Sequence, residues 1–213
     1  MDLTLLFCDV DDFVNQYRKE SMNRLENTFK KYHRNPKLSE SEIMTICVLF
    51  HQSSYRNFKA FYLEYVIKQL SSFFPNLVSY NRFVELKSSV MTILAAYLTS
   101  KFDKPTGISF IDSTPIQVCK PKRMSRNKTF KGIAKKGKST IGWFFGFKLY
   151  LIINEQGGLL SVKVTTANTD DRTPVPEMIK NIVGKLFGDK GYLSKKLSAS
   201  LLEQGVYLIT GVV

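Results

Sequence analysis

Cysteine, histidine and acidic residues are scarce in this 213-residue sequence, which holds three cysteines, two histidines and 18 aspartates and glutamates. The cysteines (Cys8, Cys47 and Cys119) are odd in number, far apart and in no paired motif. This pattern excludes a disulfide scaffold and a cysteine-based zinc site. Two histidines leave little for histidine-rich metal chemistry or a Ser-His-Asp triad. We therefore expect a reduced, cytoplasmic protein.

Long apolar runs are also missing. No stretch approaches the roughly 18 consecutive apolar residues that a membrane span requires, so no membrane association is expected. The first residues lack the basic region of a signal peptide, and Asp9, Asp11 and Asp12 interrupt the apolar stretch there. Internal repeats and low-complexity tracts are absent from the sequence. A hydrophobic content of 44% with 23% charged residues is typical of a folded soluble protein.

The charge is strongly unbalanced. Lysine and arginine number 31 against 18 acidic residues, which gives a net charge of +13 and a pI near 9.6. An excess of this size attracts polyanions and speeds encounters with them. Nucleic acid is the partner that the composition favours.

The pattern changes near residues 101–107, so we divide the chain into a helical region, 1–104, and a second region, 105–213. In the first region Ser39 and Glu42 form a predicted capping box, and apolar residues at helical spacing follow to Phe50. Further helices are predicted over 56–70 and from Ser79 to Leu98. This region is interpreted as a small helical bundle for DNA binding or dimerisation. It leaves a helix-turn-helix and a plain four-helix bundle equally open.

The second region alternates short apolar runs with turns. Its predicted order is three strands, then a helix, a strand, a helix and a strand, which indicates an antiparallel start followed by parallel strands. The strands are expected at 107–111, 145–153, 159–165, 185–188 and 206–210, and the helices at 173–182 (capped by Asp171 or Thr173) and from Ser194 to about Gln204. The fold class is therefore α/β (α+β), a helical region followed by a mixed-sheet core.

Two aspartates are the sharpest chemical feature. Asp112 and Asp189 each follow an apolar strand segment and precede residues typical of turns. Ligands collect at the carboxyl ends of strands in open α/β sheets, and oxygen donors there suit a hard cation such as Mg²⁺. The alternative is that both residues only cap turns. The metal hypothesis requires the two carboxylates to meet at neighbouring strand tips.

Three ordered motifs resemble bacterial insertion-sequence transposases of the DDE type. They are Ile111–Ile116, Thr166–Arg172 and Gly188–Tyr192, and Ser79–Glu85 is similar to the helical region of that group. The nearest resemblance is to the insertion-sequence family numbered nine-eight-two. It implies an RNase H-like catalytic core and transposition by metal-dependent DNA strand cleavage and strand transfer.

The resemblance also implies cofactors and partners. Two Mg²⁺ (or Mn²⁺) ions about 4 Å apart would clamp the scissile phosphate. Asp112 would be the first metal-binding catalytic carboxylate and Asp189 the second. The partners would be double-stranded DNA, both transposon terminal repeats and target, with a homo-oligomer assembled on it.

The family's third carboxylate, a glutamate on a helix after the fifth strand, has no counterpart here. The only acid after Asp189 is Glu203, on the helix before the last strand. We therefore expect a C-terminally truncated transposase, with an RNase H-like core that is incomplete at its C-terminus and inactive by itself.

A segment without acids, residues 120–138, is expected to be a loop that starts beside Asp112 and follows a DNA backbone. Helix capping is preferred over metal binding for Asp170 and Asp171. Core packing is preferred over base stacking for the aromatic residues 143–150. The candidate DNA-binding residues are Lys120, Lys122, Arg123, Arg126, Lys128, Lys131, Lys135, Lys136 and Lys138.

Two other functions stay open. A DNA-binding fragment that occupies transposon ends and represses transposition would bind without cleaving. A basic RNA-binding protein would require the aspartate pair to be incidental, and its RNA binding would survive Asp112→Asn.

Overall fold

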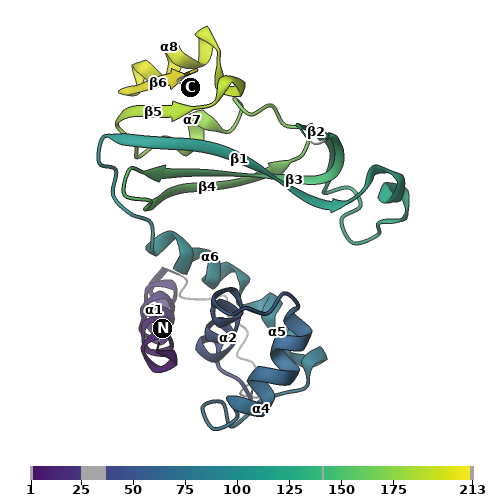
Figure 1. Ribbon diagram of the computed structural model, residues 1–213. Helices are drawn as coiled ribbons and strands as arrows, with labels where there is room; N and C mark the ends of the chain where they lie inside the picture. The colour runs from purple at the N-terminus through teal and green to yellow at the C-terminus, as the bar shows by residue number, and fades with distance from the viewer. Residues whose placement is uncertain (1, 25–36, 141, 212–213) are drawn as a thin grey trace. The chain divides into compact units, whose positions relative to one another are not determined.

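The computed structural model describes residues 2–24, 37–140 and 142–211. The chain divides into two compact units, residues 1–100 and 101–213 (Figure 1). No helix in the described part of the chain is long and apolar enough to cross a membrane.

In the described residues of the first unit, all the regular secondary structure is helical. Serine side chains begin two of its helices: Ser39 forms the predicted capping box with Glu42, and Ser79 accepts a hydrogen bond from Arg82 N at 3.4 Å. Both caps supply acceptors for N–H groups that a helix start leaves unpaired. The helices are α1 (Leu3–Arg24), α2 (Glu40–Gln52), α3 (Phe58–Ala60) continuing through the π-helical η1 (Phe61–Val66) into α4 (Ile67–Gln69), α5 (Tyr80–Ser89) and α6 (Met91–Ser100).

The predicted helix from Ser79 to Leu98 is wrong in one respect, because the structure breaks it at Val90 into α5 and α6. The hydroxyls of Ser88 and Ser89 donate to the carbonyls of Glu85 and Leu86, both at 2.7 Å. Such bonds from side chain to backbone compete with the helical ladder and bend helices. Val90 is itself fully buried, which holds the bend in place.

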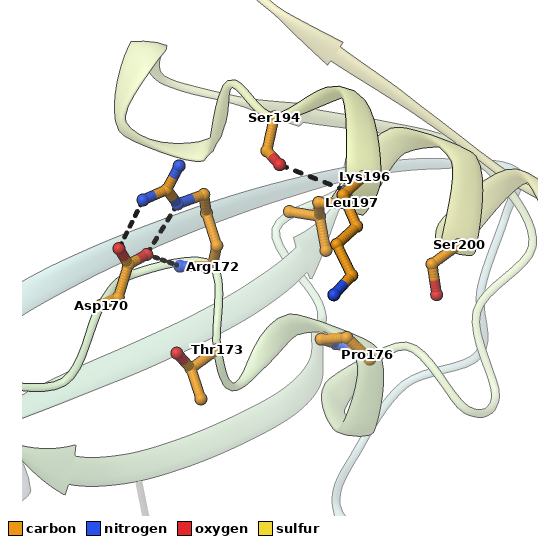
Figure 2. A pocket seen from close by; sticks show the side chains of 8 residues that line it. All are labelled: Asp170, Arg172, Thr173, Pro176, Ser194, Lys196, Leu197 and Ser200. Atoms are coloured by element: carbon orange, nitrogen blue, oxygen red, sulfur yellow. Dashed lines mark hydrogen bonds and ion pairs between the residues drawn. The ribbon is translucent and has the colours of Figure 1, made fainter.

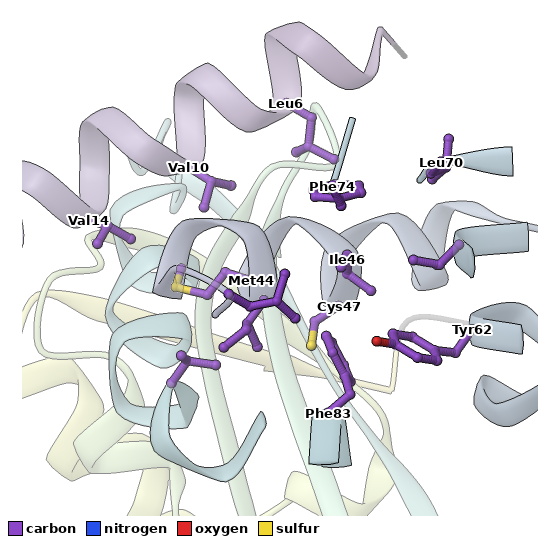
Figure 3. Close-up of a cluster of buried hydrophobic side chains, with 14 of the residues drawn as sticks. Leu6, Val10, Val14, Met44, Ile46, Cys47, Tyr62, Leu70, Phe74 and Phe83 are labelled. Carbon is purple, nitrogen blue, oxygen red and sulfur yellow. The ribbon is translucent and has the colours of Figure 1, made fainter. Parts of the chain in front are cut away.

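Apolar residues spaced three and four apart on the helices build one core (Figure 3). Phe83 lies against the ring of Tyr62, with the two centroids 4.7 Å apart. Polar contacts add to this packing at two places. Tyr97 on α6 donates a hydrogen bond to Asp9 on α1, and Arg18 on α1 pairs with Glu40 on α2.

The thiol of Cys47 lies within this core, and burial raises its pKa to about 11 from the ordinary 9.0. The reactive thiolate is therefore about a hundredfold scarcer near neutral pH than at an unperturbed cysteine. Iodoacetamide is expected to alkylate the exposed Cys8 first and Cys47 only after unfolding, as followed by mass spectrometry. Equal labelling of Cys8 and Cys47 in the native protein would contradict this packing.

The second unit is built on a mixed sheet. The long strand β3 pairs antiparallel with β1 on one edge and with β2 and then β4 on the other, while β1, β5 and β6 are parallel. The strand order is β2-β3-β1-β5-β6, with β4 beside β3 (Figure 1). The strands are β1 (Ile108–Cys119), β2 (Lys135–Ser139), β3 (Gly142–Asn154), β4 (Leu159–Thr166), β5 (Gly184–Gly188) and β6 (Val206–Thr210).

Two helices cover one face of this sheet. They are α7 (Val175–Met178) and α8 (Lys195–Glu203), and Ser194 caps α8 as predicted, accepting from Leu197 N at 3.3 Å. Their apolar residues pack on alternate strand residues such as Ile111, Ile152 and Leu186. The opposite face carries Phe110, Ile153 and Tyr207, which are all exposed.

The sequence-based elements of this unit need two corrections. The helix expected over 173–182 contracts to Val175–Met178, and its N-cap is Pro174, which makes no side-chain cap. The strand β2 was not predicted, because its sequence (Lys-Lys-Gly-Lys-Ser) has no apolar alternation. Pairing with β3 makes it a strand.

Candidate active site

Asp112 lies within β1 and not at its end. The prediction of a turn at residues 113–115 is wrong, since β1 continues to Cys119 along β3. Beyond Phe110, β1 no longer pairs with β5, so one of its edges has no partner there. A free edge tolerates Pro115, which has no N–H to donate. The side chain of Asp112 is exposed, and its Oδ1 accepts a hydrogen bond from the N–H of Ser113 at 2.7 Å.

Asp189 is the first residue after β5, as predicted. Its backbone is still extended (φ −70°, ψ 177°), and it caps the short 3₁₀ turn η3 (Lys190–Tyr192). Its Oδ1 accepts from Gly191 N at 2.9 Å. This hydrogen bond is the one that a turn-capping aspartate makes, and it engages one of the two carboxylate oxygens.

Asp112 and Asp189 stand at equivalent positions in the register of β1 and β5. Phe110 and Phe187 are partners across β1 and β5, and their rings stack on one face with centroids 5.5 Å apart. Side chains two residues further along extended strands leave from that same face, and neighbouring strands lie about 4.8 Å apart. Asp112 and Asp189 each follow this pair by two residues. The register thus places both carboxylates on the same face of the sheet, Asp112 within β1 and Asp189 directly after the end of β5.

Tyr192 lies under the end of β5, next to Asp189. It is buried, and its ring lies against Gly188, where an added Cβ would come within 2.9 Å of the tyrosine. Burial is the main cause that raises the pKa of the Tyr192 hydroxyl, and Ser113 partly opposes it. The negative charges of Asp171, Asp112 and Asp189 raise this pKa further. Three carboxylates therefore lie within electrostatic reach of one hydroxyl.

Asp171 is turned toward the sheet and does not cap α7. Its Oδ1 accepts from Lys148 Nζ and from Tyr150 Oη, both at 2.8 Å, and from Ser113 Oγ at 3.5 Å. Burial, followed by the hydrogen bond to Asp171, raises the pKa of Tyr150. The capping interpretation of Asp171 is therefore wrong, because donors on β3 and β1 take up its carboxylate.

Asp170 makes different contacts from its neighbour. Its Oδ1 accepts from the backbone N and from Nε of Arg172 at 2.9 and 2.8 Å, and Oδ2 accepts from Nη2. Figure 2 shows this pair at the side of a pocket of about 400 Å³ between the loop before α7 and the start of α8. Hydrogen bonds from Arg172 hold the pKa of Asp170 well below its usual range, and the bond from the arginine side chain has a larger effect than the bond from its backbone N–H. Asp170 closes a turn with Arg172, which also differs from the predicted helix cap.

The donor set of Asp112 and Asp189 fits a divalent cation of the Mg²⁺ type. Two exposed carboxylates on one face offer hard oxygen ligands, and Mg²⁺ is commonly held by one or two carboxylates with water and substrate phosphates in its other positions. Within the described residues no three His, Cys, Asp or Glu side chains come together as a metal-binding group. Because Asp112 and Asp189 are both exposed, a site that they form would be open to solvent and substrate.

The basic segment starts well away from Asp112, contrary to expectation. Lys120 follows Asp112 by eight residues of extended chain, about 26 Å at 3.3 Å per residue. The nine candidate DNA-binding residues are all exposed, and no ion pair among the described residues involves them. Lys120 precedes the 3₁₀ turn η2 (Pro121–Arg126), which holds Lys122, Arg123 and Arg126; Lys128 and Lys131 follow it, and Lys135, Lys136 and Lys138 lie on β2.

The end of this segment is a strand, not a loop. Gly137 lies in β2 and not at a turn. Glycine is needed there because a Cβ would come within 2.1 Å of the Ala167 carbonyl oxygen. Trp143 opposite β2 is more than half exposed, which corrects its expected place in the core, and Lys136 Nζ lies 4.5 Å from its ring centroid. Phe144 and Phe145 are buried as expected.

A family model described as a transposase DDE domain matches residues 102–213, more than half of the chain. The chain belongs to the DDE transposase domain family. In this DDE transposase domain, the mixed sheet with helices on one face agrees with the RNase H-like core that the sequence predicts.

A solved transposase structure has the same fold. A piggyBac transposase synaptic complex with hairpin DNA matches with a TM-score of 0.51 and 12% identity, covering 100% of this DDE transposase chain and 51% of the other chain. The chain thus spans about half the length of that relative. A Mos1 transposase paired-end complex with the left transposon end matches at a TM-score of 0.31 and 12% identity, over 91% and 65% of the two chains. None of the curated proteins compared with the chain matches it.

The sequence alone favours a helix cap for Asp171 and does not reveal its contacts with β1 and β3. This aspartate lies in the motif Thr166–Arg172, which carries part of the family resemblance, but its neighbours Thr173 and Pro174 suggest a helix start. A sequence signal for an acidic partner in the fold is Lys148, a lysine in an otherwise apolar strand segment. A cation at such a position requires a counter-charge nearby.

Proposed function

We propose that this chain is part of a DDE-type transposase of an insertion sequence, related to the family numbered nine-eight-two, whose chemistry is metal-dependent DNA strand cleavage and strand transfer. The observation that supports this most is the shared offset of Asp112 and Asp189, two residues beyond the stacked pair Phe110 and Phe187 on parallel strands. If the two aspartates only capped turns, nothing would require them to stand at equivalent positions on neighbouring strands.

Asp112 and Asp189 would hold the divalent ions, Mg²⁺ or Mn²⁺. Such ions polarise the scissile phosphate and lower the pKa of a bound water or 3′-hydroxyl. The role of the chain is to keep two carboxylates on rigid strands, with Ser113 N and Gly191 N each orienting one carboxylate by a hydrogen bond. Fixed first ligands reduce the cost of ordering the site when substrate binds.

The DNA would run along β1 and β3 toward the basic segment. The span of about 26 Å between Asp112 and Lys120 corresponds to about seven or eight base pairs at 3.4 Å per step. The cationic residues at the far end of β1 would then neutralise phosphates beyond the cleavage site. The piggyBac relative is a complex with hairpin DNA, which supports double-stranded DNA as the partner here.

Replacing Lys122, Lys128 and Lys131 by Gln is expected to weaken binding to DNA of any sequence. Each lost phosphate contact lowers the slope of log K against log salt by about 0.9, so the salt dependence becomes flatter. Fluorescence anisotropy at several salt concentrations measures both. Replacement of three other exposed lysines, Lys180, Lys195 and Lys196, removes the same charge and should change the slope less. Equal slopes for both variants would assign the segment another role.

The helical unit is proposed to bind transposon ends or to support a homo-oligomer on DNA. Exposed cations on it include Arg56, Lys59 and Arg82. Truncation of the catalytic core and repression by a DNA-binding fragment stay predictions.

The proposed function is tested with the DNA that flanks the coding sequence of this chain, supplied as two labelled duplexes with Mg²⁺ or Mn²⁺. Metal-dependent nicks at one fixed position in each duplex support the transposase and contradict inactivity of the chain by itself. Binding of both duplexes without cleavage supports inactivity of the chain by itself, either as a truncated transposase or as a repressor. Preference for RNA over both duplexes would contradict the two DNA functions together.

A further inference from the structure

The carboxylate of Asp171 gathers donors from two neighbouring strands onto one oxygen. Tyr150, which donates at 2.8 Å, is fully buried, and the side chain of Lys148, also at 2.8 Å, is only 15% exposed. Lys148 Nζ also donates to the carbonyl of Thr169 at 2.9 Å. These bonds fix the loop after β4 against β3, and charge-assisted hydrogen bonds of this kind are stronger than neutral ones.

Ser113 connects this cluster to the candidate metal site. It is the strand partner of Tyr150, and its hydroxyl lies 3.5 Å from Asp171 Oδ1. Its backbone N–H donates to the carboxylate of Asp112 at 2.7 Å. A single residue therefore contacts Asp171 with its side chain on one face of β1 and Asp112 with its main chain.

Tyr192 extends the contacts to the second aspartate. Its ring lies against Gly188, where an added Cβ would meet both this ring and the side chain of Ile111, and Tyr192 and Ile111 belong to one buried cluster. It follows Asp189 by three residues, and its N–H donates to the carbonyl of Asp189 at 3.2 Å. The loop that carries Asp189 thus rests on the same layer of side chains that Asp171 organises.

We propose that Asp171 is a positioning residue for the candidate metal site: through Ser113 it keeps the carboxylate of Asp112 oriented beside Asp189, and Lys148 balances its charge. The proposal rests on the proposed function, because it takes Asp112 and Asp189 as the metal ligands. Asp171 itself is occupied by its donors and is not assigned as a ligand.

Removing the charge of Asp171 has two consequences for a cation at the candidate metal site. The acceptor for Ser113 and Tyr150 becomes weaker, so β1 is held less firmly next to Asp112. The ammonium group of Lys148, mostly buried, loses its counter-charge and adds positive potential near the site. Both effects lower the affinity for a divalent cation. Residues that orient metal ligands typically change metal affinity by about 10- to 100-fold when replaced.

The test measures Mn²⁺ binding to the whole chain by the loss of the free Mn²⁺ EPR signal, with circular dichroism showing that each variant is folded. Asp171→Asn is expected to weaken Mn²⁺ binding about tenfold or more. Adding Lys148→Met to it should restore most of the affinity, because the uncompensated cation is removed. Asp170→Asn removes the same charge one residue away and should stay within about twofold of the wild type, since among the described residues the carboxylate of Asp170 is hydrogen-bonded to Arg172 and not to Ser113, Lys148 or Tyr150.

The variants separate failure of this proposal from failure of the proposed function. If Asp112→Asn and Asp189→Asn leave Mn²⁺ binding unchanged, the metal assignment itself is overturned. If those two variants lose binding while Asp171→Asn does not, only the positioning role is overturned. Should Asp171→Asn fail to fold, Ser113→Ala replaces it: loss of its hydroxyl should weaken Mn²⁺ binding several-fold, and unchanged binding would overturn the proposal.

Discussion

Replacing Asp112 by Asn, or Asp189 by Asn, is expected to remove most divalent-metal binding and any metal-dependent DNA cleavage. Asparagine keeps the shape of the side chain but removes the charge that attracts the cation. A metal ion supplies several kcal/mol of transition-state stabilisation, so its loss slows cleavage by about 10³-fold or more. Mn²⁺ affinity should fall by more than about tenfold, which is measured on the chain whether or not it cleaves DNA by itself.

DNA binding is the internal control for these variants. Both substitutions remove negative charge, so affinity for a DNA duplex should stay the same or rise. Asp170→Asn supplies the matched change in charge, since Asp170 lies in the exposed turn with Arg172. Retained Mn²⁺ binding in both Asp112→Asn and Asp189→Asn would exclude these residues as ligands. A parallel loss of DNA binding would indicate misfolding instead.

Gly184→Ala is expected to destabilise the second unit strongly. Gly184 begins β5 with φ +90°, where side chains are disfavoured, and a Cβ there would come within 2.2 Å of the Gly107 carbonyl oxygen. That oxygen accepts a hydrogen bond from Lys185 N at 2.8 Å, which joins β5 to the start of β1. Backbone strain and overpacking together predict a loss of about 3 kcal/mol or more, measured by urea unfolding.

Gly157→Ala separates strain from the clash. Gly157 also has a positive φ, +84°, but its Cβ would meet nothing within 4 Å. It should therefore lose only about 1–2 kcal/mol, the cost of the backbone conformation. Equal losses in the two variants would show that Gly107 does not lie against Gly184 in solution. The larger loss at Gly184 should also weaken Mn²⁺ binding, because β5 carries Asp189.

Local signals in the sequence predict three of the helix starts and the antiparallel hairpin of β3 and β4. Ser39, Ser79 and Ser194 each cap a helix as expected, since a cap depends only on residues a few positions away. The full length of β1 and the existence of β2 depend on pairing with β3, which is distant in sequence. Patterns over short windows do not contain that information, so the prediction ended β1 at the first turn-like residues.

The candidate site likewise contains residues that local sequence patterns reveal and one that they do not. Asp112 and Asp189 stand out because each follows an apolar strand segment in the sequence. The role of Asp171 could not be found locally, because its three donors come from residues 113, 148 and 150, which only the fold brings together. Its neighbours Thr173 and Pro174 favoured a helix cap. Long-range hydrogen bonds therefore decide which aspartate of the loop contacts β1 beside Asp112.

A crystal of the chain grown with Mn²⁺, with diffraction measured on both sides of the manganese absorption edge, tests most directly whether Asp112 and Asp189 share a metal. An anomalous peak is expected within bonding distance of carboxylate oxygens from both Asp112 and Asp189. Manganese bound elsewhere, or the two side chains directed to opposite faces of the sheet, would contradict the assignment.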